Sequence, residues 1–257
     1  ERVAKQMNIL VTGANGFVGK NLIAELKNEG YTDIFSFDID TPKDLLDEYC
    51  KKADFVFHLA GVNRPKNEVE FMEGNFGFTS ELLSKLKEHQ NTCPVMISSS
   101  IQAALENSYG KSKKAGEELL KSYQEETGAP VYIYRFANLY GKWSRPNYNT
   151  VVATFCYKIA RNEEVTVNDP NAAVELCYID DVVKELLHCL NGKPYMENGY
   201  CAVRETDEVT IGELKELITS FKNSRTDLSV PNLARRVEKN LYSTYLSFLP
   251  EDDFSYF

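Results

Sequence analysis

A glycine-rich segment near the start of the chain, TGANGFVG at residues 12–19, limits the possible folds more than any other feature. It follows the apolar run MNILVT (7–12), which has the pattern of a buried parallel strand. It leads into the amphipathic stretch GFVGKNLIAELKNEG, which predicts a helix that Gly30 ends. Strand, glycine loop and helix in this order are typical of the unit that binds the pyrophosphate of a dinucleotide.

Each glycine of this loop has a distinct task in such a unit. The first permits a tight turn, the second lets the backbone approach the pyrophosphate, and the third allows the helix to pack closely on the strand. The helix N-terminus adds free N–H groups and a positive dipole end. A turn without a ligand is the alternative. We predict cofactor binding by the following loop residues: Gly13, Asn15, Gly16, Phe17, Val18 and Gly19.

Short apolar runs and longer amphipathic stretches alternate through the first 140 residues. Further strands are expected at 33–38, 53–61, 94–99 and 130–136. Helices are expected at about 69–89 and 108–127. This β-α-β repetition predicts an α/β fold with a Rossmann-type, doubly wound parallel sheet.

The alternation loosens after about residue 140, which predicts a smaller, mixed substrate lobe towards the C-terminus. The expected organisation is a dinucleotide-binding core over 7–140, a region over 141–246 that is mainly the substrate lobe and is intertwined with the core, and a linker over 247–257. We expect that linker to lead to a domain absent from this chain. Residues 1–6, ahead of Met7, are expected to be an extension.

Composition argues against several classes of function. The formal net charge of −9 offers no general positive field for a nucleic-acid partner. No apolar run is long enough to span a bilayer, and we expect no signal peptide, because ERVAKQ leads straight into a strand pattern. The six Cys form no C-x-x-C pair and the three His are far apart, so we expect no metal site. Reduced thiols predict a cytoplasmic protein.

A second stretch, SSSIQAALENSYGKSKKAGEELL (98–120), places Tyr109 and Lys113 four residues apart after three serines. Spacing alone is weak evidence, because fifteen Tyr and twenty Lys placed at random would give about one such pair. The context is stronger, since the serines end a predicted parallel strand, and open α/β sheets bind ligands at that end. A polar loop that runs into an ordinary exposed helix is the alternative.

Asp38 ends the second predicted strand, nineteen residues after Gly19. A carboxylate there can accept hydrogen bonds from the adenosine ribose and would repel a 2′-phosphate, which favours NAD over NADP. A solvated loop Asp is the alternative, and Lys43 or Arg64 could offset its charge.

Several motifs, in the right order over nearly the whole chain, resemble the extended short-chain dehydrogenase/reductases, the NAD-dependent epimerase/dehydratase family. They are the glycine loop, DFVFHLAG (54–61), NFGFTSELL (75–83), the Tyr109/Lys113 pair, RFANLYG (135–141) and YIDDVV (178–183). The resemblance implies cofactor contacts from Leu59, Ala60, Gly61, Asn75 and Ser98. It also implies that Asn138 meets a nucleotide-sugar, and that the chain forms a homodimer through helices 69–89 and 108–127.

Four segments resemble, more narrowly, the capsular-polysaccharide reductases that make N-acetyl-L-fucosamine precursors: HLAGVNRP, SSSIQA, FCYKIARNEE and LYSTYLSFLPEDDFSY. Those are two-part proteins in which a metal-binding cupin domain follows the reductase. The resemblance implies reduction of the C4 ketone of a UDP-2-acetamido-2,6-dideoxy-4-hexulose, with the cupin domain missing here. That subgroup is associated with NADPH, whereas Asp38 favours NAD(H), so NAD(H) and NADP(H) both stay open.

In such a reductase Tyr109 would protonate the ketone oxygen as hydride reaches carbon. An unperturbed Tyr has a pKa of about 10. We expect the charge of Lys113, one turn along the helix, to lower that pKa and Lys113 also to hold the nicotinamide ribose. By analogy with the family, Ser100 would hydrogen-bond the developing oxyanion. These three residues are the predicted catalytic set.

The remaining alternatives concern reaction and substrate. Ile101 and Gln102 stand where the family's dehydratases carry an Asp-Glu pair, which disfavours dehydration because neither can act as acid or base. A UDP-sugar 4-epimerase with tightly bound NAD and a non-catalytic dinucleotide sensor stay open. Besides Ser100 and Asn138, the substrate candidates are Arg64, Arg145 and Asn149, for the first two of which a solvated surface charge is the alternative.

Overall fold

The computed structural model describes residues 5–61, 69, 72–148 and 150–254, which form two compact units. The first unit takes in Glu1–Phe136 and Val183–Arg204, and the second takes in Ala137–Val182 and Glu205–Phe257. The chain therefore leaves the first unit after its Rossmann-like strands, builds part of the second, and returns.

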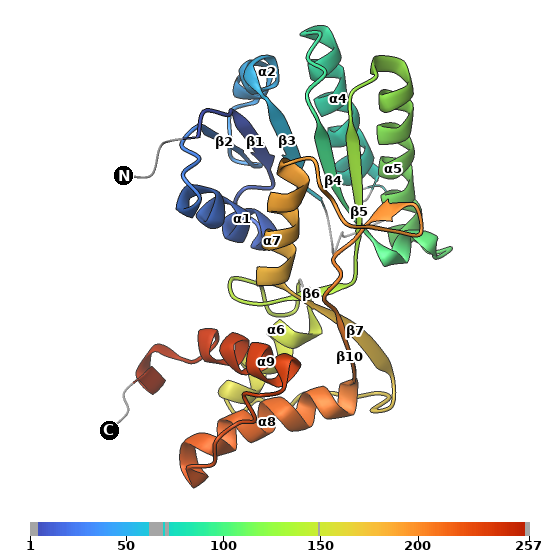
Figure 1. Ribbon diagram of the computed structural model, residues 1–257. Helices are drawn as coiled ribbons and strands as arrows, with labels where there is room; N and C mark the ends of the chain where they lie inside the picture. Colours follow the sequence, from blue (N-terminus) through green and yellow to red (C-terminus); the bar gives the residue numbers. More distant parts are fainter. Residues whose placement is uncertain (1–4, 62–68, 70–71, 149, 255–257) are drawn as a thin grey trace. The chain divides into compact units, whose positions relative to one another are not determined.

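A seven-stranded sheet forms the centre of the first unit, as far as the described residues show (Figure 1). The strand order is β2-β1-β3-β4-β5-β9-β8, and the first five strands are parallel. The strands are β1 (Ile9–Thr12), β2 (Ile34–Phe37), β3 (Phe55–His58), β4 (Val95–Ser100), β5 (Val131–Phe136), β8 (Met196–Glu197) and β9 (Tyr200–Cys201). This confirms the predicted α/β fold with a Rossmann-like parallel sheet.

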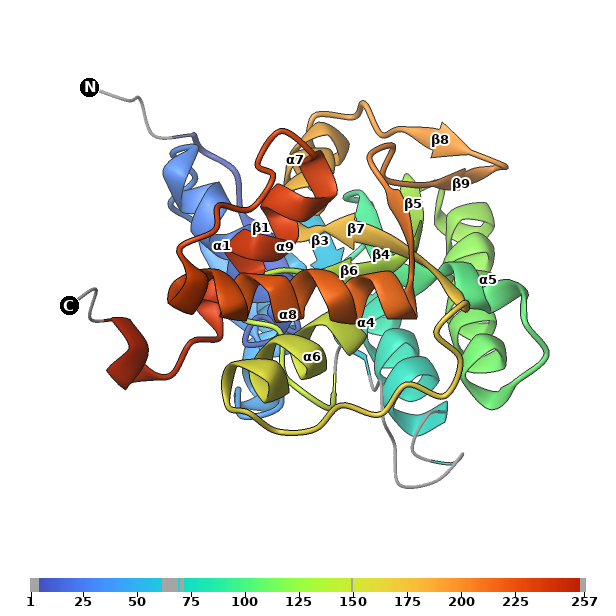
Figure 2. The ribbon, with the colours of Figure 1, turned by 90° about the horizontal axis from the view of Figure 1, so that it is seen from below.

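Helices cover both faces of this sheet. Helices α2 (Lys43–Lys52), α4 (Phe78–Glu88) and α5 (Ser108–Thr127) pack on one face, over a core that includes Leu10 and Val56. Helix α1 (Phe17–Asn28) and the part of α7 (Ile179–Leu190) that belongs to this unit stand on the other face (Figures 1 and 2).

Local sequence signals explain where these helices begin and end. Helix α1 stops before Gly30, which has a φ of +95°, as its position in the sequence predicts. Asn107 caps α5 by accepting a hydrogen bond from the backbone N–H of Gly110 at 2.7 Å. The predicted helix over 69–89 differs in its first turns, where a π-helical segment, η1 (Met72–Gly77), precedes α4.

The strand order fixes where a ligand belongs. Strand β1 has β2 on one side and β3 on the other, so the connections run in opposite directions from β1 and leave a crevice at its carboxyl end. The glycine loop follows β1 and residues 59–61 follow β3, so both predicted cofactor segments lie at this point. Strand β4, which ends at Ser100, is next in the sheet.

The second unit has a small mixed sheet, in which β7 (Ala173–Tyr178) pairs parallel with β6 (Asn138–Tyr140) and antiparallel with β10 (Asp207–Thr210). Helices α6 (Val151–Ala160), α8 (Ile211–Asp227) and α9 (Arg236–Ser247) pack together on it around buried residues such as Phe221 (Figure 2). Thr210 caps α8 by accepting from the N–H of Glu213 at 3.0 Å, as predicted. Within the described chain no helix is long and apolar enough to cross a membrane.

Candidate active site

The glycine loop has a geometry that side chains would destroy. Gly13 has a φ of +65°, and a Cβ there would lie 2.7 Å from the backbone nitrogen of Ala60. A Cβ on Gly19 would lie 2.2 Å from the carbonyl oxygen of Gly13. The first position thus needs the left-handed conformation, and the third needs the close packing of α1 on the loop.

The start of α1 is suited to an anion. In the described structure Gly16 begins this helix without a side-chain cap, and no acidic residue lies in the first turn. The N–H groups and positive dipole end of the helix are therefore available to a pyrophosphate. The Phe17 side chain is buried in the core, whereas Asn15 is exposed beside the loop.

Asp38 is tied directly to this loop. One carboxylate oxygen accepts the backbone N–H of Asn15 at 2.8 Å, and the other accepts the N–H of Ile39 at 2.7 Å. Asp40 accepts from the side chain of Asn15 at 3.2 Å. Two carboxylates therefore flank the glycine loop at the end of β2, where the sequence predicts contact with the adenosine ribose.

A buried relay of hydrogen bonds connects β1, β3 and η1. The Thr12 hydroxyl oxygen lies 3.1 and 3.2 Å from the backbone nitrogens of Leu59 and Ala60, which donate to it, and 2.7 Å from Nδ1 of His58. On its other side, Nε2 of His58 lies 2.8 Å from the Thr79 hydroxyl, which donates to the Asn75 carbonyl.

This relay fixes the protonation of His58. Because Thr79 gives its proton to a carbonyl, it must accept from Nε2–H of His58, which leaves Nδ1 to accept from Thr12. His58 is 1 % exposed, and its burial, with a smaller effect from the charge of Lys113, lowers its pKa to about 3. A neutral imidazole therefore holds the segment after β3 to the segment that carries Asn75.

Asn75, Gly61 and Lys113 meet at one point, although they are far apart in sequence. A Cβ on Gly61 would lie 3.0 Å from Oδ1 of Asn75 and 3.3 Å from Nζ of Lys113. The Asn75 amide also donates to Ser112 on α5 at 3.2 Å. A π-helical turn is a common device for aiming a side chain at a functional site, and here it carries Asn75.

The predicted catalytic residues converge where β4 runs into α5. Ser100 ends β4, is 9 % exposed, and accepts the N–H of Gln102 at 3.1 Å. Tyr109 stands in the first turn of α5 and hydrogen-bonds with Ser100. Nζ of Lys113 lies 5.6 Å from the centre of the Tyr109 ring.

The pKa of Tyr109 departs from the sequence prediction. Burial raises it, and the hydrogen bond with Ser100 opposes that rise only in part. The prediction that Lys113 lowers this pKa was wrong in its net direction, because removal from water outweighs the other effects. Burial also lowers the pKa of Lys113 to about 8, against the opposing charge of Glu117.

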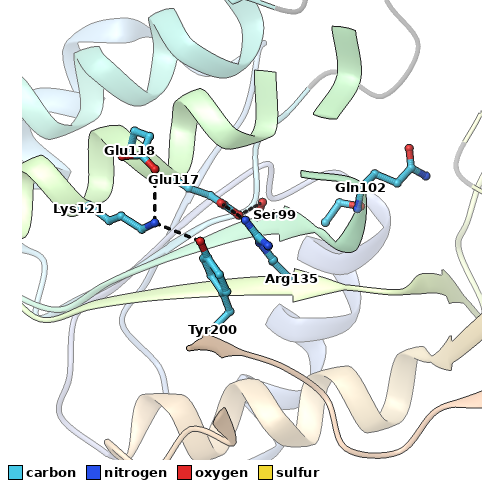
Figure 3. A network of polar contacts seen from close by, with 8 residues as sticks. Ser99, Gln102, Glu117, Glu118, Lys121, Arg135 and Tyr200 are labelled. Atoms are coloured by element: carbon cyan, nitrogen blue, oxygen red, sulfur yellow. Dashed lines mark hydrogen bonds and ion pairs between the residues drawn. The ribbon is translucent and has the colours of Figure 1, made fainter. Parts of the chain in front are cut away.

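Sequence reasoning missed a buried ion pair behind the serines, shown in Figure 3. Glu117 on α5 accepts two hydrogen bonds from Arg135 on β5, at 2.8 and 2.9 Å, and one from Ser99 at 2.8 Å. The signal was present, since Arg135 is a charge inside the apolar strand VYIYRF and therefore needs a partner. Ser98 is half-buried at the same strand end.

Apart from Ser100, the predicted substrate residues belong to the second unit or lie outside the described residues. Asn138 and Arg145 belong to the second unit, where the Asn138 amide donates to the Glu175 carbonyl at 3.0 Å and the Arg145 guanidinium lies 4.7 Å over the Tyr148 ring. Arg64 and Asn149 lie outside the described residues. Among the residues that are described, no three His, Cys, Asp or Glu gather as metal ligands.

Comparison with known proteins agrees with this geometry. The profile of the NAD-dependent epimerase/dehydratase family matches residues 9–196. The chain belongs to this family. The resemblance predicted from the sequence is thus confirmed, and the glycine loop, Asp38 and the Ser100–Tyr109–Lys113 cluster all fall within the matched region.

Two known proteins are similar to nearly the whole of this chain. The chain is 45 % identical, over 251 residues, to the UDP-2-acetamido-2,6-beta-L-arabino-hexul-4-ose reductase of Pseudomonas aeruginosa, covering 97 % of this chain and 67 % of that protein. A crystal structure of the capsular polysaccharide assembling protein CapF from Staphylococcus aureus matches with a TM-score of 0.89 and 50 % identity, over 97 % of this chain and 68 % of that one. The chain spans about two thirds of the length of each.

Solved structures of lower sequence identity share the fold. The Bordetella bronchiseptica enzyme WbmF, solved in complex with NAD⁺, superposes with a TM-score of 0.78 at 21 % identity, over 96 % of this chain and 93 % of that one. At that identity the likeness concerns the Rossmann-like fold alone. The glycine loop of this chain is of the kind that binds the pyrophosphate of the family's nicotinamide cofactor.

Proposed function

We propose that this chain reduces the C4 ketone of a UDP-2-acetamido-2,6-dideoxy-4-hexulose with a reduced nicotinamide cofactor. The observation that carries the proposal is the cluster of Ser100, Tyr109 and Lys113 beside the ligand-binding edge of a family-typical sheet. The choice of substrate rests on the 45 % identity to the Pseudomonas aeruginosa hexulose reductase.

The residues present fit a dinucleotide. Gly13, Gly16 and Gly19 form a loop that leaves the start of α1 open to a pyrophosphate. Asp38 is held against the loop by the Asn15 N–H, where it would take the adenosine ribose hydroxyls. We propose NADH as the preferred cofactor, because Asp38 and Asp40 together would repel the 2′-phosphate of NADPH.

The side chains would share the chemistry as follows. The bound cofactor supplies hydride to the carbonyl carbon. Tyr109 gives its phenolic proton to the ketone oxygen, which becomes the product hydroxyl. Ser100 would donate a hydrogen bond to the same oxygen as negative charge grows on it. Lys113 as a cation stabilises the tyrosinate left behind and would hold the nicotinamide ribose.

The other proposed cofactor contacts come from Leu59, Ala60, Gly61, Asn75 and Ser98. The other proposed substrate contacts come from Asn138 and Arg145. Homodimerisation and a following cupin domain also remain proposals from the family resemblance. A UDP-sugar 4-epimerase uses the same three catalytic residues, and a dinucleotide sensor would need none of them as an acid.

The test is a consumption assay at 340 nm with a UDP-2-acetamido-2,6-dideoxy-4-hexulose, run separately with NADH and NADPH. We expect oxidation of the cofactor by the wild-type chain, faster with NADH, and its loss in Tyr109→Phe. No oxidation of either cofactor, while the dinucleotide still binds, would reject the reductase activity of this chain. NAD that stays bound through purification, with interconversion of C4 epimers, would establish the epimerase instead.

A further inference from the structure

The ion pair behind the serines has a direct connection to the proposed catalytic lysine. Glu117 lies one turn after Lys113 on α5, so the two side chains share a face of the helix. Glu117 is fully buried (0 % exposed), and Arg135 and Ser99 occupy both of its oxygens. A buried carboxylate held by a bidentate guanidinium keeps its negative charge and one fixed position.

Among the groups around Lys113, the negative charge of Glu117 is the one that favours the protonated lysine. Around Lys113 stand Tyr109 and Glu117 from its own helix, His58 from β3 and the uncharged Asn75 from η1. His58 is neutral, since its pKa is about 3, and Tyr109 is a phenol near neutral pH, since burial raises its pKa. Within the described part of the chain, Glu117 is the one carboxylate whose charge acts on Lys113.

Arg135, the partner of Glu117 in the ion pair, is covered by an aromatic ring. The Arg135 guanidinium lies 3.7 Å from the centre of the Tyr200 ring, contributed by β9 (Figure 3). Lys121 donates to the Tyr200 hydroxyl at 3.1 Å and pairs with the exposed Glu118 at 3.4 Å. Arg135 is therefore packed between an aromatic ring and the buried carboxylate, and it acts on Lys113 by holding Glu117 in place.

We propose that Glu117, fixed by Arg135 and Ser99, is a positioning residue that keeps Lys113 in its cationic form beside Tyr109. The proposal rests on the reductase function proposed above. Burial works against the lysine charge and the charge of Glu117 opposes that effect, and together they leave the pKa of Lys113 at about 8. Without Glu117, the lysine would lose its proton at a lower pH, and the tyrosinate formed during reduction would lose its counter-charge.

The first test is the pH profile of kcat/KM for ketone reduction in Glu117→Gln. We expect its alkaline limb to lie at lower pH than in the wild type, with activity recovering towards the wild-type value as the pH falls. The control is Glu118→Gln, the neighbouring exposed residue of the same helix, which should reproduce the wild-type profile. A purely structural role for Glu117 would lower the rate by the same factor at every pH, and that result would overturn the proposal.

A double variant covers the case in which Glu117→Gln alone does not fold. Removing Glu117 alone leaves a partly buried guanidinium without its counter-ion, whereas Glu117→Gln with Arg135→Gln removes both charges together. The double variant should show the same shift of the alkaline limb. A wild-type profile in this variant would reject the role of Glu117.

A second measurement separates this proposal from the proposed function. The Lys113 Cε signal can be followed by NMR against pH in lysine-¹³C-labelled protein and assigned with Lys113→Arg. Its titration midpoint should fall in Glu117→Gln and stay unchanged in Glu118→Gln. If the wild type does not reduce the hexulose but the midpoint still falls, the function fails and the electrostatic role of Glu117 stands. An unmoved midpoint rejects that role.

Discussion

The burial of His58 should make the free energy of unfolding depend on pH, by an amount that follows from its pKa values. Its imidazole is 1 % exposed and bridges Thr12 and Thr79 as a neutral donor and acceptor. The folded-state pKa is lowered to about 3 from an ordinary value of 6.5. Between those two values the unfolded chain binds a proton at this histidine and the folded chain does not. Stability contributed by His58 is therefore complete above the unfolded value and is lost as the pH falls.

The size of the effect follows from the two pKa values. Each pH unit below 6.5 costs about 1.4 kcal/mol, down to the folded value. Between pH 7 and pH 5 the loss should be about 2 kcal/mol for this residue alone. The variant His58→Gln has no titrating group at this site, so urea unfolding of both proteins at pH 7, 6 and 5 isolates the contribution. The pH dependence from carboxylates and other histidines cancels in the difference.

A matched control distinguishes titration from loss of the relay. Thr79→Val removes the acceptor of the imidazole N–H but keeps the histidine. It should be less stable at pH 7 by about 1–3 kcal/mol, because a buried donor is left unsatisfied, and it should retain a steep pH slope. Equal losses of stability from pH 7 to pH 5 in the wild type and His58→Gln would refute the reasoning.

Three further substitutions test the proposed site. Tyr109→Phe should lower kcat for ketone reduction by about 10²–10⁴-fold, with cofactor binding by fluorescence titration retained. Asp38→Ser should raise the ratio of kcat/KM for NADPH to that for NADH by about tenfold or more, because a repulsive charge is removed; an unchanged ratio would show that Asp38 does not select the cofactor. Gly19→Ala should cost about 1–3 kcal/mol in cofactor binding or stability, since its Cβ would lie 2.2 Å from the Gly13 oxygen. The control Gly77→Ala adds a Cβ in open space and should bind the cofactor as the wild type does.

The features that the sequence predicted well are local ones. The tight turn at Gly13, the end of α1 at Gly30 and the cap at Thr210 each depend on a few neighbouring residues. Alternating apolar runs likewise predict strands and helices without knowledge of their partners. The placement of Tyr109 and Lys113 together follows from helical spacing alone.

The missed features depend on sheet register and on burial. Ser99 lies opposite Arg135 because β4 and β5 pair in one particular register, and only that register brings both to Glu117 on α5. Nothing in the periodicity of either strand determines it. The direction of the Tyr109 pKa was wrong for a related reason, since spacing shows its charged neighbour but not the loss of water around it.

The protonation of Tyr109 also bears on the choice between a reductase and a retaining epimerase. An epimerase begins by taking a proton from the C4 hydroxyl, which needs a tyrosinate, whereas a reductase begins with a ketone and needs a phenol. Burial raises the pKa of Tyr109, so the phenol predominates near neutral pH and favours the reductive direction. Oxidation of the product alcohol by the same chain should therefore rise with pH where reduction does not. If both directions shared one pH profile across the neutral range, the state of Tyr109 would not set the direction of the reaction.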